Sequence, residues 1–203
     1  MQNLNDIKGE VAGSFLLGIS QSFANLNIFT EDILEDNIET IDPVKWYPYY
    51  KLIELLNYVK INYHNESKSI LFRAGINFIN LWYEHGPGKN MIFSGLDWIY
   101  ANSESQGYNS VVRGGEKSDI GWCNIIKIDE KEGIVVYENV TPLPSDLVKG
   151  IFYGGCFLFY DMEYVYIEST EEEYEQNPAF IKIMLTLRFK VKSKKQSLRL
   201  ESK

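Results

Sequence analysis

Histidine and cysteine are both scarce in this sequence of 203 residues, which holds only two of each. His64 and His85 are not spaced as a metal-binding pair, and two histidines give no basis for a Ser-His-Asp triad. Cys123 and Cys156 lie in apolar segments and form no disulfide framework. Reduced thiols in the cytosol are therefore expected, without a metal site or a catalytic nucleophile.

Long apolar runs and excess positive charge are missing too. No segment approaches the roughly 18–20 apolar residues that span a bilayer, and no basic start precedes an apolar stretch, so neither a membrane span nor a secretory signal is expected. The net charge of −8 argues against nucleic acid as a partner, because phosphates would be repelled. Basic residues gather only from Lys190 onward, and residues 192–203 are predicted to be a disordered, solvated tail, with contact to an anionic surface as the alternative.

Aromatic residues, in contrast, are abundant. The 14 Tyr, 11 Phe and 4 Trp are a high aromatic content for a soluble protein. Most are expected to lie in the core, but their flat faces also suit contact with an apolar ligand. The composition is otherwise that of a globular protein. We expect one ligand-binding domain over residues 1–191, helical over 7–110 and with a sheet over 120–191.

Helical spacing of apolar residues runs through the first half of the chain. Spacings of three and four place Val11, Phe15 and Phe23 on one face, and Pro48 suits the first turn of a helix. A helix ending in the sequence HGPG is apolar over much of its circumference, as a central helix should be. The segments predicted to be helical are 10–26, 30–38, 42–63, 67–88 and 91–105.

The second half alternates in the manner of strands. Two predicted strands precede the apolar segment 147–159 and two follow it. Gly150 and Gly154 share one face of a helix, so 147–159 is predicted to be a crossover helix whose small residues lie close to the sheet. The expected fold class is α+β: an N-terminal helical layer on a four-stranded antiparallel sheet of ββαββ order.

Two passages carry a resemblance to a known group of domains. GWCNIIKI (121–128) and VYENVTPLPSDLVKGIFYGG (136–155) resemble the 4-vinyl-reductase domain and its relatives in haem–nitric oxide binding and in vesicle tethering (TRAPP). VAGSFLLGISQSF (11–23) and WYPYYKLIELLNYV (46–59) resemble bacterial single-domain relatives of myxobacterial type. The resemblance implies a sensory domain that binds a small ligand and signals to another protein.

The cofactors of this group are not expected here. Haem–nitric oxide binding relatives carry an axial histidine and a Tyr-x-Ser-x-Arg motif, but the matching segment 99–110 has no histidine and the motif occurs nowhere in the chain. Zinc-binding relatives carry cysteines near their last hairpin, and residues 167–189 hold none.

The candidate site is an apolar hollow between the helices and the sheet. Apolar walls and a few polar anchors are typical of such pockets, although core packing is the alternative for each aromatic residue, and an exposed face or salt bridge is the alternative for the arginine. The candidate ligand-binding residues are Phe72, Arg73, Ile76, Asn77, Tyr83, Trp98, Trp122 and Phe157. Whether His85 also reaches the hollow stays open.

The favoured function is a cytoplasmic, non-enzymatic sensory or binding module that encloses a small, mostly apolar molecule. One alternative is a dimeric interaction or tethering scaffold without a small ligand, whose subunits join through exposed Phe15 or Phe23. The two are compatible, since a homodimeric sensor with a separate signalling partner would do both. The second alternative is a haem-based gas sensor.

Overall fold

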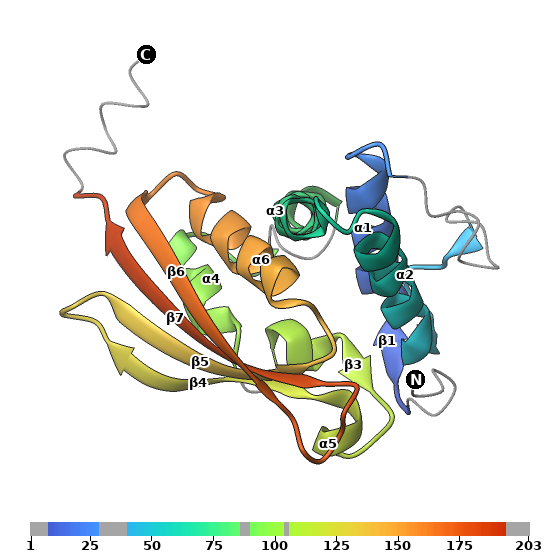
Figure 1. The fold of residues 1–203 in the computed structure, drawn as a ribbon. Coiled ribbons are helices and arrows are strands. Elements are labelled where there is room, and N and C mark those ends of the chain that lie inside the picture. Colours follow the sequence, from blue (N-terminus) through green and yellow to red (C-terminus); the bar gives the residue numbers. More distant parts are fainter. Residues whose placement is uncertain (1–7, 29–39, 86–89, 104–105, 194–203) are drawn as a thin grey trace.

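Helices form one part of the molecule and a large antiparallel sheet forms the other (Figure 1). The computed structural model describes residues 8–28, 40–85, 90–103 and 106–193. Its elements in chain order are β1 (Glu10–Ala12), α1 (Gly13–Ala24), β2 (Trp46–Pro48), α2 (Tyr49–Asn62), α3 (Ser67–His85), α4 (Gly95–Ala101), the 3-10 helix η4 (Gly107–Ser110), β3 (Val112–Arg113), α5 (Lys117–Ile120), β4 (Trp122–Asp129), β5 (Ile134–Thr141), α6 (Ser145–Phe157), β6 (Met162–Glu173) and β7 (Ile181–Val191).

The large sheet has the order β4-β5-β7-β6, and every neighbouring pair is antiparallel. Side chains of strands alternate between the two faces, so Val135 and Tyr137 of β5 share the buried face with Leu185 and Leu187 of β7. Helices α4 and α6 lie over that face (Figure 1). Because α6 connects the two hairpins, the predicted α+β class and ββαββ order are confirmed.

A second sheet was not predicted from the sequence. Strand β1 lies between β2 and β3, and this three-stranded sheet replaces the first turn of the predicted helix 10–26. The Ala12 amide donates to the Val111 carbonyl at 2.9 Å, a partner 99 positions away that local periodicity cannot reveal. The helix begins at Gly13, where a Cβ would overlap the carbonyl oxygen of Asp42.

Phe15 and Phe23 are buried within the core of the fold. Phe15 is 6% exposed and Phe23 fully buried, and the Phe15 ring meets the edge of Phe78 with centroids 4.9 Å apart. The prediction that these two side chains join subunits is therefore wrong, because the α1 stripe packs on α3 instead of on solvent. The predicted helix at 30–38 lies outside the described residues.

Helix α2 confirms the later part of the predicted helix 42–63, whereas residues 46–48 form strand β2. Pro48 directly precedes the first residue of α2, where a fixed φ and a missing N–H cost nothing. The buried side chains of α2 include Leu52, Leu55, Leu56 and Val59, whose helical spacing places them on one face. None of the helices in the described part of the chain is long and apolar enough for a bilayer.

The glycines of α6 face a helix and not the sheet. A Cβ on Gly150 would overlap the carbonyl oxygen of Phe72, and one on Gly75 of α3 would lie 2.5 Å from the carbonyl oxygen of Leu147. The predicted contact of Gly150 and Gly154 with the sheet is therefore corrected. It is Phe152 that turns toward the sheet, with its ring 4.6 Å from that of Tyr137. Small residues let α3 and α6 approach backbone to backbone, and Figure 1 shows α3 between α6 and α1.

This contact predicts graded effects of two alanine substitutions. Alanine favours a helix over glycine by about 1 kcal/mol. At Gly150 the new methyl group overlaps the α3 backbone, so Gly150→Ala is expected to lower the free energy of unfolding by about 2–4 kcal/mol. At Gly154 the Cβ would lie 3.0 Å from the Ile76 Cα, so Gly154→Ala should change the free energy by less than about 1 kcal/mol. Urea unfolding measures both, and equal stabilisation by the two variants would contradict the close packing.

Candidate functional site

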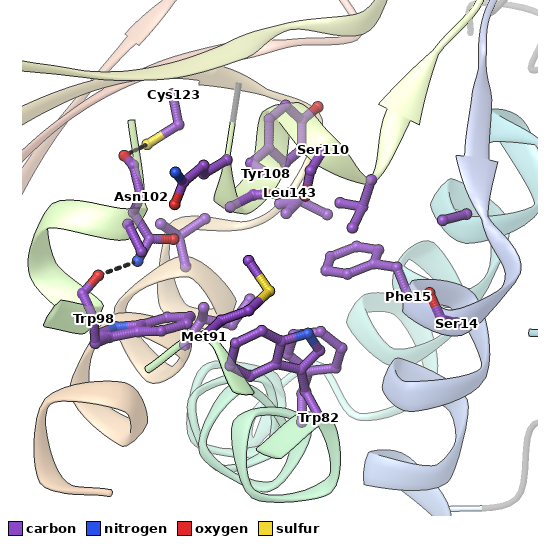
Figure 2. A pocket seen from close by; sticks show the side chains of 18 of the residues that line it. Ser14, Phe15, Trp82, Met91, Trp98, Asn102, Tyr108, Ser110, Cys123 and Leu143 are labelled. Carbon is purple, nitrogen blue, oxygen red and sulfur yellow. Dashed lines mark hydrogen bonds between the residues drawn. The ribbon is translucent and has the colours of Figure 1, made fainter. Parts of the chain in front are cut away.

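A cavity of about 380 Å³ lies between the helices and the large sheet (Figure 2). Helices α1, α3, α4 and α6 contribute to its walls, together with β4, β5 and the loops before α2 and around η4. The lining is largely apolar, as in most small-molecule sites. Among the described residues, the aromatic side chains of its lining are Phe15, Trp46, Phe78, Trp82, Trp98, Tyr108 and Phe152.

Trp98 is held in the cavity wall by the way α4 begins. The Ser94 hydroxyl accepts from the Asp97 amide at 3.0 Å, and the Asp161 carboxylate accepts from the Gly95 amide at 3.1 Å. These bonds satisfy amides at the helix start, which have no partner within the helix. The Trp98 ring then meets Trp82 of α3 with centroids 5.7 Å apart.

The indole nitrogen of Trp98 has no hydrogen-bond partner among the described residues. A Cβ on Gly155 would overlap this nitrogen, so this edge of the ring lies against α6 and not toward the centre of the cavity. Because Gly155 has no side chain, the Trp98 ring can pack against the α6 backbone, just as the absence of a side chain at Gly150 lets α3 pack there.

Buried polar groups gather at the end of the cavity nearest the sheet. Asn102 is 5% exposed and Asn139 is 3% exposed. The Asn102 side-chain amide donates to the Trp98 carbonyl at 2.7 Å, while its amide oxygen points toward the hollow in Figure 2. The Cys123 thiol donates to the Asn102 carbonyl at 3.4 Å.

A loop amide positions Cys123 against this polar end. Asn109 accepts from the Cys123 amide at 2.9 Å and donates to the Cys123 carbonyl at 2.8 Å. Burial raises the pKa of the Cys123 thiol to about 12, and burial likewise raises the pKa of Cys156. Both thiols are therefore neutral at physiological pH and are poor nucleophiles.

Tyr108 closes another side of the cavity with a phenol that is already bonded. Its hydroxyl donates to the Ile120 carbonyl at 2.6 Å and accepts from the Tyr49 hydroxyl. Burial raises the pKa of both phenols. Lys45 is the one ionised side chain among the described lining residues; it is 69% exposed and lies 3.5 Å from the Asp42 carboxylate. The interior of the cavity is thus uncharged.

Of the eight residues predicted for the site, Trp98 lines the cavity and the other seven do not. Phe72 and Phe157 instead pack on the ring of Tyr153, at centroid distances of 5.7 and 4.8 Å. Tyr83 meets Phe159 at 5.3 Å. These three rings therefore belong to the contact of α3 with α6 and with the residues that directly follow α6.

The remaining predicted residues lie in two other places. Arg73, Ile76 and Asn77 lie together in a separate hollow beside α1. Trp122 packs on Tyr174 at 5.7 Å and donates its indole N–H to Glu138 at 3.4 Å. A binding role for these residues stays a prediction, but the structure does not bring them to the cavity.

The sequence analysis missed the polar residues of the cavity, although one of them carries a readable signal. In β5, Asn139 is in phase with the buried Val135 and Tyr137, so an inward-facing amide follows from strand alternation. Phe78 and Trp82 belong to the broad apolar surface of α3, which gives no sign of the side that faces the cavity. Asn102 gives no such signal, because asparagine is common at helix ends.

No protein-family model matches this chain, and neither does any curated protein. Solved structures of H-NOX (haem–nitric oxide/oxygen binding) domains do match. One described as "Modulating Heme Redox Potential Through Protein-Induced Porphyrin Distortion" is 13% identical, covering 89% of this chain and 96% of its own, with a TM-score of 0.67.

Two further structures agree with this match. A mutant of the T. Tengcongensis H-NOX is 15% identical over 88% of this chain and 97% of its own, with a TM-score of 0.64. An oxygen-binding H-NOX domain related to soluble guanylate cyclases is 13% identical over 88% of this chain and 92% of its own, with a TM-score of 0.61. Such identities establish the fold alone. The haem–nitric oxide binding-like fold is thus confirmed, and the resemblance to 4-vinyl-reductase, tethering and myxobacterial proteins stays a prediction.

The donor groups of the cavity do not fit a ligated haem. Haem iron takes histidine, cysteine thiolate, methionine or tyrosine as its axial ligand. Both histidines are exposed, and His85 is paired with Glu84 at 3.7 Å, so neither reaches the described cavity walls. Cys123 is a neutral thiol and the Tyr108 hydroxyl is engaged. Met91 lines the cavity, but a methionine ligand is paired with a histidine in haem sites, and the described lining has no histidine.

The buried thiols predict a loss of stability in alkaline solution. Because the folded state holds Cys123 protonated to about pH 12, while an unfolded thiol ionises near 8.5, the stabilisation is complete below about pH 8.5 and declines as the pH rises. The free energy of unfolding should fall by up to about 1.4 kcal/mol per pH unit for each thiol between pH 8.5 and 10. Urea unfolding of Cys123→Ala/Cys156→Ala should show a flatter profile in this window, and an identical slope would contradict the assignment.

Proposed function

We propose that this protein is a non-enzymatic sensory or binding module whose cavity encloses a small, mostly apolar molecule. The uncharged cavity between the helices and the sheet carries the proposal. Its volume of about 380 Å³ falls in the range of ligand pockets, roughly 300–1,000 Å³. An engineered apolar cavity of about 150 Å³ already binds benzene.

A haem-based gas sensor is the second candidate function. The H-NOX structures favour it over a haem-free module, since one is described by its haem and another by bound oxygen. The lining of this cavity favours the haem-free module, because its described residues offer no imidazole and no thiolate. The two candidates share the fold and the cavity and differ in the occupant.

We further propose that this module signals to a second protein, or through assembly of the module itself. We propose a cytoplasmic location and a homodimer, with subunits joined by a surface other than Phe15 and Phe23, which are buried. The dimeric scaffold without a ligand remains an alternative. If the sedimentation coefficient remains that of a monomer across micromolar concentrations, both the homodimer and the scaffold are contradicted.

Filling the cavity is expected to displace its occupant. Ala101 lines the cavity, so Ala101→Leu should reduce by at least about tenfold the fraction of protein that carries a co-purified small molecule in native mass spectrometry. Ala24, at the end of α1, does not line the cavity, so Ala24→Leu serves as the matched control and should retain the molecule. Equal occupancy of the two variants, or no bound molecule in the wild type, would contradict the proposal.

Addition of haem separates the two candidates. The haem-free module predicts that the visible spectrum shows only free haem, since the described lining offers no histidine and no thiolate, and the Tyr108 hydroxyl is engaged. A sharp, saturable Soret band at one haem per chain would overturn this expectation and establish the second candidate. Ala101→Leu again provides the control, because it should abolish a band that arises from the cavity.

A further inference from the structure

We infer that the ligand is an uncharged, flat aromatic molecule with one hydrogen-bonding group, held between the aromatic walls and the amides of Asn102 and Asn139. The inference rests on the proposed function and specifies the chemical class that the cavity takes. Three observations carry it: the charge of the lining, the arrangement of the rings and the placement of the two amides.

The lining selects against charge. No carboxylate lines the described walls, and the ionised Lys45 is solvent-exposed and paired with Asp42. Cys123 and Tyr108 remain protonated because burial disfavours their ions. A charged ligand would lose its hydration without gaining a counter-charge inside, which makes its transfer into the cavity unfavourable.

The walls select for a flat aromatic shape. Trp82 meets Trp98 at an interplanar angle of 60°, and Phe15 meets Phe78 at 76°. Each of these four rings lines the cavity, so the walls present both ring faces and ring edges. Aromatic molecules pack on such surfaces in offset or edge-to-face geometry. The volume is more than twice the roughly 150 Å³ that accommodates benzene, so two fused rings fit.

The amides select for one polar group. A side-chain amide offers two donor hydrogens and an acceptor oxygen, and Asn102 uses one donor on the Trp98 carbonyl. Asn139 lines the same cavity and lies beside the Cys123 thiol. Asn102 retains hydrogen-bonding groups beyond its bond to Trp98, and its amide oxygen points toward the hollow in Figure 2. A ligand hydroxyl, which both donates and accepts, suits this pair because a buried polar group is costly when left unpaired.

Aromatic walls also bind cations, but this cavity is poorly suited to one. The ring of Trp46 is already covered by the Arg113 guanidinium, 4.2 Å from its centroid. No carboxylate lines the described walls, so a cationic ligand would find no counter-charge there. A cationic probe is therefore included in the test as an opposing outcome.

Four probes of one shape test the inference by calorimetry at pH 7: naphthalene, 2-naphthol, 2-naphthoate and 2-naphthylmethylammonium. Any co-purified molecule is first removed, and native mass spectrometry verifies that the protein is empty before the titrations. We expect 2-naphthol to bind roughly twofold to tenfold more tightly than naphthalene. Both ions should bind at least about tenfold more weakly than 2-naphthol.

Variants of the two asparagines test whether the tighter binding of 2-naphthol arises from their side-chain amides. Asn139→Leu should remove most of the advantage of 2-naphthol over naphthalene while naphthalene itself still binds. Asn77→Leu is the matched control, because Asn77 lies in the separate hollow on α3 and should leave the advantage unchanged. Asn102→Leu, checked for folding by circular dichroism, repeats the test at the second amide.

The outcomes separate this inference from the proposed function. Equal binding of all four probes, or tighter binding of either ion, would overturn the inference while leaving the binding module intact. A 2-naphthol preference that survives both cavity variants would overturn the role of the amides. If no probe binds although a native co-purified molecule is present, the aromatic class is wrong and the binding module stands. If neither probes nor a native molecule bind, both fail.

Discussion

The contact between α3 and α6 is the constraint on which the rest of the structure depends. The two helices meet backbone to backbone at Gly75 and Gly150, where no side chain fits. Since α6 also packs on the sheet through Phe152, this one contact ties the helical half to the strands. It places Phe78 and Trp82 of α3 across from α6, and the cavity lies where the two halves diverge.

The cavity combines a familiar fold with an unfamiliar set of donors. H-NOX structures at TM-scores of 0.61 to 0.67 share the architecture with this chain at 13–15% identity. A fold sets where a cavity can form, whereas side chains set what it binds. Here the described lining combines aromatic and aliphatic side chains with the buried amides of Asn102 and Asn139 and with a thiol whose pKa is raised by burial to about 12. Such a lining stabilises neutral molecules and disfavours ions.

Sequence reasoning succeeded where the pattern is local and failed where it depends on distant partners. Alternation located all four strands of the large sheet, and the spacing of small residues identified α6 as a helix. The same glycines were assigned to the wrong neighbour, because periodicity gives a face but not what that face contacts. Strand β1 was read as helix because its partners β2 and β3 lie far along the chain.

The sequence by itself determined the α+β class, the crossover helix, the scarcity of metal ligands and the aromatic character of the interior. These properties follow from composition and from periods of two and 3.6 residues, which need no knowledge of the fold. The tertiary structure alone decided that Trp98 lines the cavity while Phe72 and Trp122 do not. It also brought Asn102 and Asn139 to the same end of the cavity. An aromatic residue in a core and one in a pocket wall have the same local pattern, so only the packing of α3 against α6 and the sheet distinguishes them.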